Sequence, residues 1–170
     1  MHLMEADRLF ARSFEELEPG LGFETRGRTI TESDLVSFSA LTGDWHPQHA
    51  DAEWAAESRF GERIAHGMLV LSYAVGLAPL DPSRIVALRG LERVTFKRPV
   101  RIGDTIRLRG TVAEISPLDG ETALVRLAWE IVNQDDRAVA RAAVSVVWRG
   151  GGAGSSNGEP ATEELERLRP

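Results

Sequence analysis

The chain has 170 residues, of which 20 are Lys or Arg and 26 are Asp or Glu, giving a formal net charge of -6 at pH 7. This length suits one full hydrophobic core rather than two ordinary domains. The basic residues are scattered along the chain, so no concentrated positive face is expected to meet phosphates, and nucleic acid is excluded as the expected partner.

Cysteine is absent from the sequence, which excludes disulfides, thiolate metal ligands and a cysteine nucleophile. A reducing, cytoplasmic location is therefore expected. Residues 1–14 carry acidic and basic side chains with no apolar run, so we expect neither a secretory signal nor a membrane anchor. The longest apolar run, residues 68–80, is too short to span a bilayer and predicts a buried element.

The first predicted elements are a strand within residues 17–30 and a helix that begins at Thr31. The Thr31 hydroxyl can cap the free amides of the first turn, and Asp34 completes the capping pattern three residues later. The helix also has an apolar stripe and a glycine that can end it in a left-handed conformation: Leu35, Phe38, Leu41 and Gly43.

A loop over residues 44–49 is predicted to lead into a second helix at residues 51–58, with Asp51 as its N-cap and Trp54 as a buried anchor. Residues 64–80 are apolar on nearly every face. This pattern predicts a long helix that is surrounded by other structure.

From Val86 onward the apolar residues recur with a period of two, which predicts half-buried strands. The clearest inward-facing set is Ala123, Val125, Leu127, Trp129 and Ile131. Short turns at Gly103-Asp104, Asp119-Gly120 and Asp135-Asp136 would join four consecutive strands into an antiparallel sheet. A sheet curled around one buried helix is an α+β arrangement.

Residues 1–150 are accordingly predicted to form a single domain. Residues 151–170 begin with a stretch rich in Gly and Ser, which is typical of a flexible linker. We therefore expect a flexible tail at residues 151–170.

Asp44 and His49 stand five residues apart across a loop that Pro47 stiffens. A carboxylate and an imidazole aimed at one water molecule would supply general acid and base functions near neutral pH. The structural alternative is that Asp44 caps a helix end and His49 is a surface side chain.

Gly67 opens the predicted long helix, directly after His66. Its backbone amide, assisted by the helix dipole, could donate to a carbonyl oxygen that gains negative charge. The alternative interpretation is that Gly67 only permits close packing. We interpret His66 as a hydrogen-bonded structural residue.

Two linked blocks carry a resemblance to a known family: Gly43-Asp44-Trp45-His46-Pro47-Gln48-His49 and Ile64-Ala65-His66-Gly67-Met68, with Ser72 further along the same helix. They resemble the hydratase motif of the MaoC-like (R)-specific enoyl-CoA hydratases and dehydratases. Residues 96–100 and 103–105 also look like the strand-and-turn signature of that family, so the likeness covers residues 14–148.

The resemblance implies a hot-dog fold, in which an antiparallel sheet wraps a long central helix, and a hydro-lyase that reversibly hydrates a trans-2-enoyl thioester to the (R)-3-hydroxyacyl thioester. It implies Asp44 and His49 as the catalytic pair and the Gly67 amide as the donor to the thioester carbonyl. His46 and Ser72 would contribute to substrate binding. The family usually carries Asn at the position of His46, and an imidazole can replace that amide as a hydrogen-bond donor.

The resemblance further implies an acyl-CoA or acyl-carrier thioester as substrate, no metal or redox cofactor and a homodimer with its site between subunits. Three alternatives stay open. They are a thioesterase on the same fold, a non-catalytic thioester-binding subunit of a heteromeric dehydratase, and a metal site. The metal ligands would be Asp44, His46, His49 and Asp51.

Overall fold

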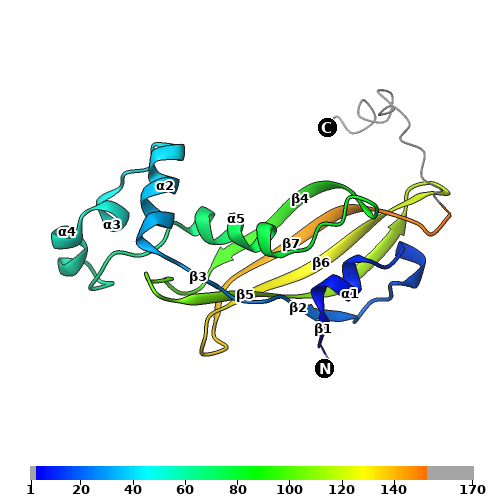
Figure 1. Cartoon of the computed structure of the whole chain (residues 1–170), viewed down its shortest axis with the longest axis horizontal. Helices are drawn as coiled ribbons and strands as arrows, with labels where there is room; N and C mark the ends of the chain where they lie inside the picture. Colours follow the sequence, from blue (N-terminus) through cyan, green and yellow to red (C-terminus); the bar gives the residue numbers. More distant parts are fainter. Residues whose placement is uncertain (1–2, 153–170) are drawn as a thin grey trace.

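A computed structural model describes residues 3–152, whose arrangement is visible in Figure 1. The elements in chain order are β1 (Leu3–Glu5), α1 (Ala6–Phe10), a 3-10 turn (Phe14–Glu16), β2 (Gly22–Glu24), β3 (Arg28–Thr29), α2 (Glu32–Thr42), α3 (Pro47–Ala50), α4 (Ala52–Glu57), α5 (Gly67–Leu77), β4 (Ile85–Phe96), β5 (Thr105–Pro117), β6 (Thr122–Val132) and β7 (Ala138–Arg149). The predicted tail at residues 151–170 lies, except for Gly151 and Gly152, outside the described residues.

The long strands form one curved sheet in the order β1-β2-β5-β6-β7-β4. β5, β6 and β7 are consecutive antiparallel neighbours, as predicted. The expectation that β4 pairs with its successor β5 is wrong, because β4 pairs with β7 at the other side of the sheet. The link between β4 and β5 contains Pro99 and is held at Val100 and Arg101 to residues 64–65, so it cannot form a hairpin turn.

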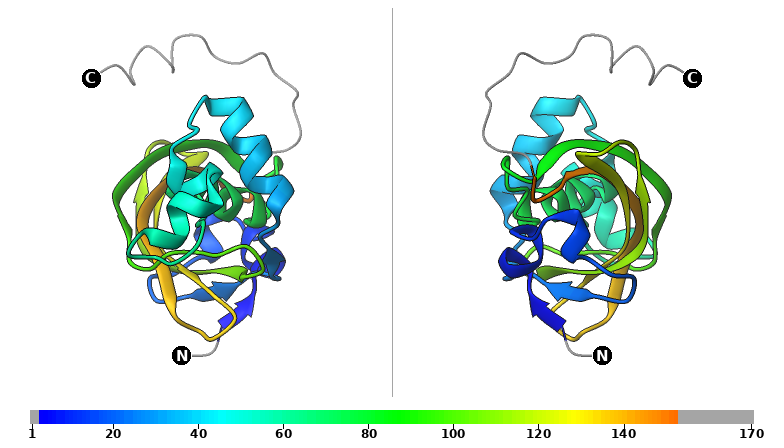
Figure 2. Two further views of the ribbon diagram at one scale, coloured as in Figure 1. Left: turned by 90° about the vertical axis from the view of Figure 1, so that its left-hand side faces the viewer. Right: turned by 90° about the vertical axis from the view of Figure 1, so that its right-hand side faces the viewer.

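The inner face of the sheet carries the alternating residues that the sequence predicts. Ala123, Val125, Leu127, Trp129 and Ile131 of β6 are each at most 3% exposed. Val125, Leu127, Trp129 and Ile131 belong to the same core as the buried side of α5, which includes Leu69 and Ala74. The end-on views of Figure 2 show the strands curving around this helix, and the predicted α+β architecture is confirmed.

The central helix is shorter than predicted and less enclosed. It begins at Gly67 rather than residue 64, because Ile64 and Ala65 are held in extended conformation against the segment after β4. Met68 is 55% exposed and Ser72 and Gly76 are exposed, so one side of α5 is open within the single chain. No helix among residues 3–152 has the length and apolar character required to cross a membrane.

The three helices before α5 lie beyond one end of the sheet (Figure 1). The capping box of Thr31 and Asp34 and the left-handed Gly43 are confirmed, and so is the Asp51 cap of α4. The predicted burial of Leu41 and Trp54 is wrong, since they are 82% and 46% exposed. Helices at the end of a sheet bury only the side that faces the core.

Two segments differ locally from the prediction. The expected strand within residues 17–30 is split into β2 and β3, because Thr25 between them bonds the Leu108 backbone through both its amide and its hydroxyl. The expected loop at residues 44–49 ends at His46. Pro47 starts α3 instead of preventing a helix, since proline is well tolerated at the first helical position.

Candidate active site

Three side chains from two separate segments of the chain converge at the junction of the small helices with α5. Each of Asp44, His49 and His66 places a nitrogen or oxygen atom within 4.8 Å of those of the other two. Asp44 follows α2, His49 lies in α3 and His66 is the N-cap of α5. The structure thus brings the predicted acid–base pair together beside the amino end of the central helix.

The tight path from α2 to α3 determines this geometry. Gly43 adopts φ 77° and reverses the chain after α2. Asp44 then accepts a hydrogen bond from the His46 amide, at 3.2 Å. The His46 Nδ1 in turn accepts from the Gln48 amide, at 3.1 Å, and caps α3. At Nδ1 His46 therefore acts as an acceptor, whereas the family resemblance suggested that it replaces Asn as a donor.

The His49 ring has one defined proton position. Its Nδ1 lies 2.7 Å from the Ile64 carbonyl oxygen, and because a carbonyl only accepts, Nδ1 must donate. In the neutral ring Nε2 then carries a free lone pair. Burial lowers the pKa of His49 below its ordinary value of 6.5 and the neighbouring His66 acts in the same direction, against the Ile64 carbonyl and the Asp44 carboxylate. This lowered pKa favours the neutral ring of His49.

His66 links the parts of the site, and sequence reasoning recognised only its structural character. Its side chain is buried, with Nε2 3.1 Å from both the Asp44 carbonyl oxygen and the Ser39 hydroxyl oxygen. Its ring stacks on His49 with centroids 3.8 Å apart. Within the described part of the chain its Nδ1 is buried without a partner. The His-Gly pair that opens an apolar helix was the available signal for this role.

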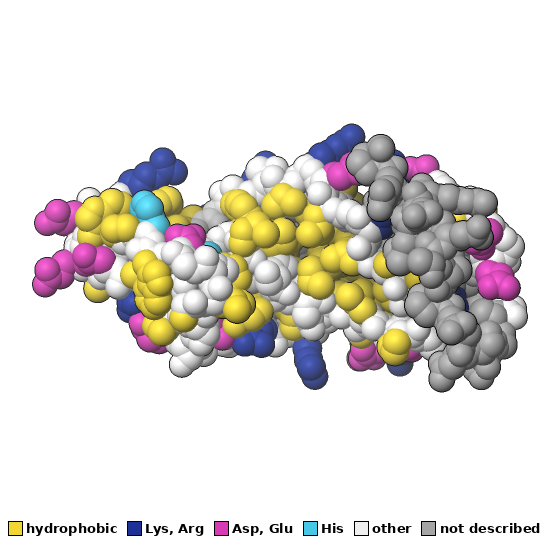
Figure 3. Space-filling view, turned by 90° about the horizontal axis from the view of Figure 1, so that it is seen from above, with side chains coloured by type: hydrophobic (Ala, Val, Ile, Leu, Met, Phe, Trp, Pro, Cys, Tyr) yellow, Lys and Arg dark blue, Asp and Glu magenta, His cyan; other side chains and the backbone are white. Residues whose placement is uncertain are grey.

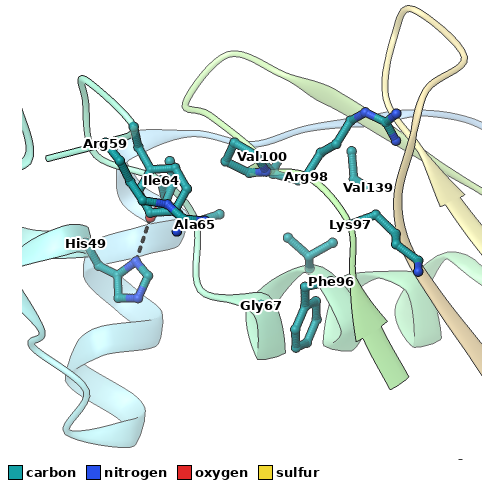
Figure 4. A pocket seen from close by; sticks show the side chains of 13 residues that line it. His49, Arg59, Ile64, Ala65, Gly67, Phe96, Lys97, Arg98, Val100 and Val139 are labelled. Atoms are coloured by element: carbon teal, nitrogen blue, oxygen red, sulfur yellow. Dashed lines mark hydrogen bonds between the residues drawn. The ribbon is translucent and has the colours of Figure 1, made fainter. Parts of the chain in front are cut away.

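Gly67 and His49 line a common cavity of about 250 Å³, shown in Figure 4. Gly67 is the first residue of α5, so its amide has no partner within the helix, and the N-cap residue supplies no side-chain bond to the first turn. A Cβ atom at Gly67 would lie 2.7 Å from the Phe96 ring. Both interpretations of Gly67 are therefore compatible with the structure, since it offers a free amide and also permits close packing.

The other three predicted site residues lie outside this cavity lining. Asp44 is exposed but lies beside His49, whereas His46 and Ser72 do not join that group. His46 is exposed, and its ring meets Trp54 edge-on at a centroid distance of 5.6 Å. Ser72 is exposed on α5 and donates to the Met68 carbonyl at 2.8 Å. Their role in substrate binding stays a prediction.

The four predicted metal ligands are not gathered as a set among residues 3–152, because His46 caps α3 and Asp51 Oδ1 accepts from the Trp54 amide. The group that does converge is Asp44, His49 and His66. The two imidazole planes are only 28° apart and stacked. Metal binding requires each lone pair to point at the ion within its own ring plane, so stacked rings are poorly arranged to share one.

These features define a class of protein in which a sheet wraps a helix and a carboxylate and two imidazoles meet at the start of that helix. Comparison with known proteins gives the family. Residues 15–134 match the family model described as "MaoC like domain". The chain belongs to the MaoC-like domain family.

The relatives include hydratases. The chain is 37% identical over 117 residues to an (R)-specific enoyl-CoA hydratase of Rhodospirillum rubrum, covering 67% of this chain and 78% of the relative. It is 45% identical over 105 residues to Protein MaoC of Klebsiella aerogenes, covering 60% of this chain. The match spans only 31% of the length of that second protein.

Solved structures give the fold. A monoamine oxidase regulatory protein from Archaeoglobus has a TM-score of 0.76 and 38% identity, covering 81% of this chain and 94% of the other. A double hot-dog protein from Mycobacterium tuberculosis shares the fold at 22% identity, with a TM-score of 0.75 over 92% of this chain and 50% of the other. The predicted hot-dog fold is thereby confirmed.

Proposed function

We propose that this chain is a hydro-lyase that reversibly adds water to a trans-2-enoyl thioester and forms the (R)-3-hydroxyacyl thioester. The observation that carries the proposal is the convergence of Asp44 and His49 at the amino end of α5. Family membership supports it, since one relative is named as an (R)-specific enoyl-CoA hydratase and another, from Methylorubrum extorquens, as a 3-hydroxybutyryl-CoA dehydratase.

In the proposed reaction, Asp44 and His49 hold one water molecule between them. The free Nε2 of neutral His49 takes a proton as the water oxygen bonds to Cβ, and Asp44 orients the water by accepting its other hydrogen. The electrons of the double bond move toward Cα, and Cα then receives one proton from the pair of Asp44 and His49. Water is thus added in full to one face of the double bond, and the pair regains its starting protonation.

The proposed role of Gly67 is electrostatic. As Cβ is attacked, negative charge moves onto the thioester oxygen, and the free amide of Gly67 can donate to it. The dipole of α5 adds positive potential at the same point. His46 and Ser72 are proposed to act in substrate binding, His46 through its free Nε2 and Ser72 through its hydroxyl oxygen.

The reaction as proposed requires no metal or redox cofactor, because water and the thioester supply every atom that is transferred. Coenzyme A or an acyl carrier enters only as part of the substrate. Dialysis against a chelator should therefore leave turnover intact.

We also propose that the chain acts as a homodimer. The edge strand β4 exposes Val86, Leu88, Leu91 and Phe96, each at least 37% accessible. Figure 3 shows apolar side chains gathered in the middle of one face of the molecule. An apolar edge strand and an open side of the central helix promote association with other chains unless another surface covers them. A second copy of the chain would bring its own β4 and α5 to this face.

Mixing the purified chain with crotonyl-CoA tests the proposal. Hydration predicts loss of the enoyl absorbance without release of free thiol, and a product that an (R)-3-hydroxyacyl-specific dehydrogenase oxidises. Thiol release at the rate of absorbance loss would instead indicate the thioesterase. Inactivity toward straight, branched and dicarboxylic enoyl thioesters, reversed by an added partner subunit, would indicate the non-catalytic subunit.

A further inference from the structure

A group of basic side chains lies around the cavity that holds His49 and Gly67. Arg59 follows α4, and Lys97 and Arg98 directly follow β4. All three line the cavity and are exposed, as expected for its rim. In Figure 4 Lys97 and Arg98 lie across the cavity from His49, and Arg59 lies near Ile64.

These cations differ from their neighbours in having no acidic partner. Within residues 3–152, none of the three lies within 4.0 Å of a carboxylate, and the cavity lining contains no Asp or Glu. Nearby Arg63 and Arg101, by contrast, pair with Glu32 and Glu62 at 2.6 Å. In a chain with more acidic than basic residues, the rim is a local excess of positive charge.

The bonds that the rim residues do make leave donors free. Arg98 uses Nη1 to donate to the Ala138 carbonyl at 2.6 Å, which fixes the side chain while its remaining N–H groups are available. Arg59 lies over the Phe60 ring, 4.9 Å from its centroid. Such partly oriented guanidinium groups are well suited to bidentate contacts with phosphate oxygens.

We propose that Arg59, Lys97 and Arg98 bind the phosphate groups of the thioester carrier, as found in coenzyme A or phosphopantetheine. This inference rests on the proposed function, because it takes the reacting thioester to lie at Gly67 and His49. The pantetheine arm would leave the cavity past the rim, and the phosphates are the permanent anions of a substrate such as crotonyl-CoA. Binding there would favour carrier-linked thioesters over thioesters without phosphate.

The test compares kcat/KM for crotonyl-CoA with kcat/KM for crotonyl-pantetheine, which lacks phosphate. We expect Arg59→Ala, Lys97→Ala and Arg98→Ala each to lower this ratio about tenfold, mainly through a higher KM for crotonyl-CoA. Raised salt should lower the ratio of the wild type and have less effect on the variants. Arg8→Ala, a matched loss of one exposed arginine on α1, should retain the wild-type ratio.

Equal ratios in the wild type and the three variants would overturn the inference while leaving the hydration itself intact. A second result would also overturn it. If the variants keep the preference for coenzyme A but lose activity toward mesaconyl-pantetheine, whose acyl group carries a free carboxylate, relative to crotonyl-pantetheine, the rim binds that carboxylate and not the phosphates. If Arg98→Ala does not fold, Lys97→Ala decides. If the wild type hydrates neither substrate, the proposed reaction fails. Calorimetric titration with coenzyme A then tests the rim separately. In that titration we expect Lys97→Ala to bind coenzyme A about tenfold more weakly than the wild type.

Discussion

At the scale of single residues, the His46 imidazole makes the helix-capping hydrogen bond that an Asn side chain makes in other proteins. Its Nδ1 accepts from the Gln48 amide at the start of α3, which is the bond that an Asn oxygen makes at an N-cap. The Asn expected from the family resemblance and the His found here therefore meet the same local requirement.

We expect His46→Asn to retain the stability of the wild type, because the amide oxygen can cap α3. His46→Ala should lower the free energy of unfolding by about 1 kcal/mol through loss of the cap. Urea unfolding followed by circular dichroism measures both. Equal destabilisation by the two substitutions would contradict the capping role.

The pH dependence of turnover tests the state of His49. Burial and His66 lower the pKa of His49, so the folded chain holds the proton less tightly than the unfolded chain. The neutral base is then lost only as the pH falls through that lowered value. The acid limb of a plot of kcat/KM against pH should have its midpoint below 6.5, the ordinary value. A midpoint above 6.5 would show that the Asp44 charge dominates instead.

The same shift affects stability in a defined direction. Between the folded and the unfolded pKa of His49 the unfolded chain binds more protons, so stability rises with pH in this window below about 6.5.

The sequence predicted Asp44 and His49 as the candidate pair from their spacing and from the family resemblance. It could not reveal the contact of His49 with His66, because the contact depends on how α3 and α5 pack.

At the scale of elements, a polar cluster ties α2 to α5. The Tyr73 hydroxyl on α5 donates to Asp34 Oδ1 at 2.5 Å, and Arg28 bonds the same oxygen at 3.0 Å. Burial raises the pKa of Asp34, but the hydrogen bonds from Tyr73, Thr31 and Arg28 together outweigh it, so the pKa lies below its ordinary value. Because Asp44 lies two residues beyond the end of α2, this cluster also holds the segment that carries Asp44 against the helix that carries Gly67.

Tyr73→Phe should lower the free energy of unfolding by about 1.5 kcal/mol, since it removes a hydrogen bond to a charged group. We also expect a lower kcat, because α2 and the loop after it are held less firmly to α5. Denaturant unfolding and turnover of crotonyl-CoA measure the two effects. Wild-type stability in this variant would contradict the tether.

The ends of the elements show what local patterns can and cannot predict. The α2 caps were predictable because a capping box is local to residues 31–34. The start of α5 was not, because residues 64–65 leave the helix to bond with the segment after β4. The pairing of β4 with β7 likewise depends on partners far along the chain, although the alternation within each strand predicted its buried face.

At the scale of the whole molecule, the exposed apolar residues of β4 carry the prediction of a homodimer. Leu88→Lys should shift the chain to monomers, because a charge would be buried in the interface. Leu118→Lys is the matched control, since Leu118 is 50% exposed and lies outside both β4 and α5. Sedimentation equilibrium measures the mass of each. A wild type that sediments as a monomer would contradict the assembly.

The central claim is that Asp44 and His49 activate one water molecule, and the direct measurement is crotonyl-CoA hydration by the wild type, Asp44→Asn and His49→Gln. Loss of either group should reduce kcat at least about a hundredfold, with circular dichroism unchanged. Asp51→Asn, a nearby carboxylate that becomes an equally good helix cap, should keep the wild-type rate. Turnover near the wild-type rate in both site variants would contradict the account.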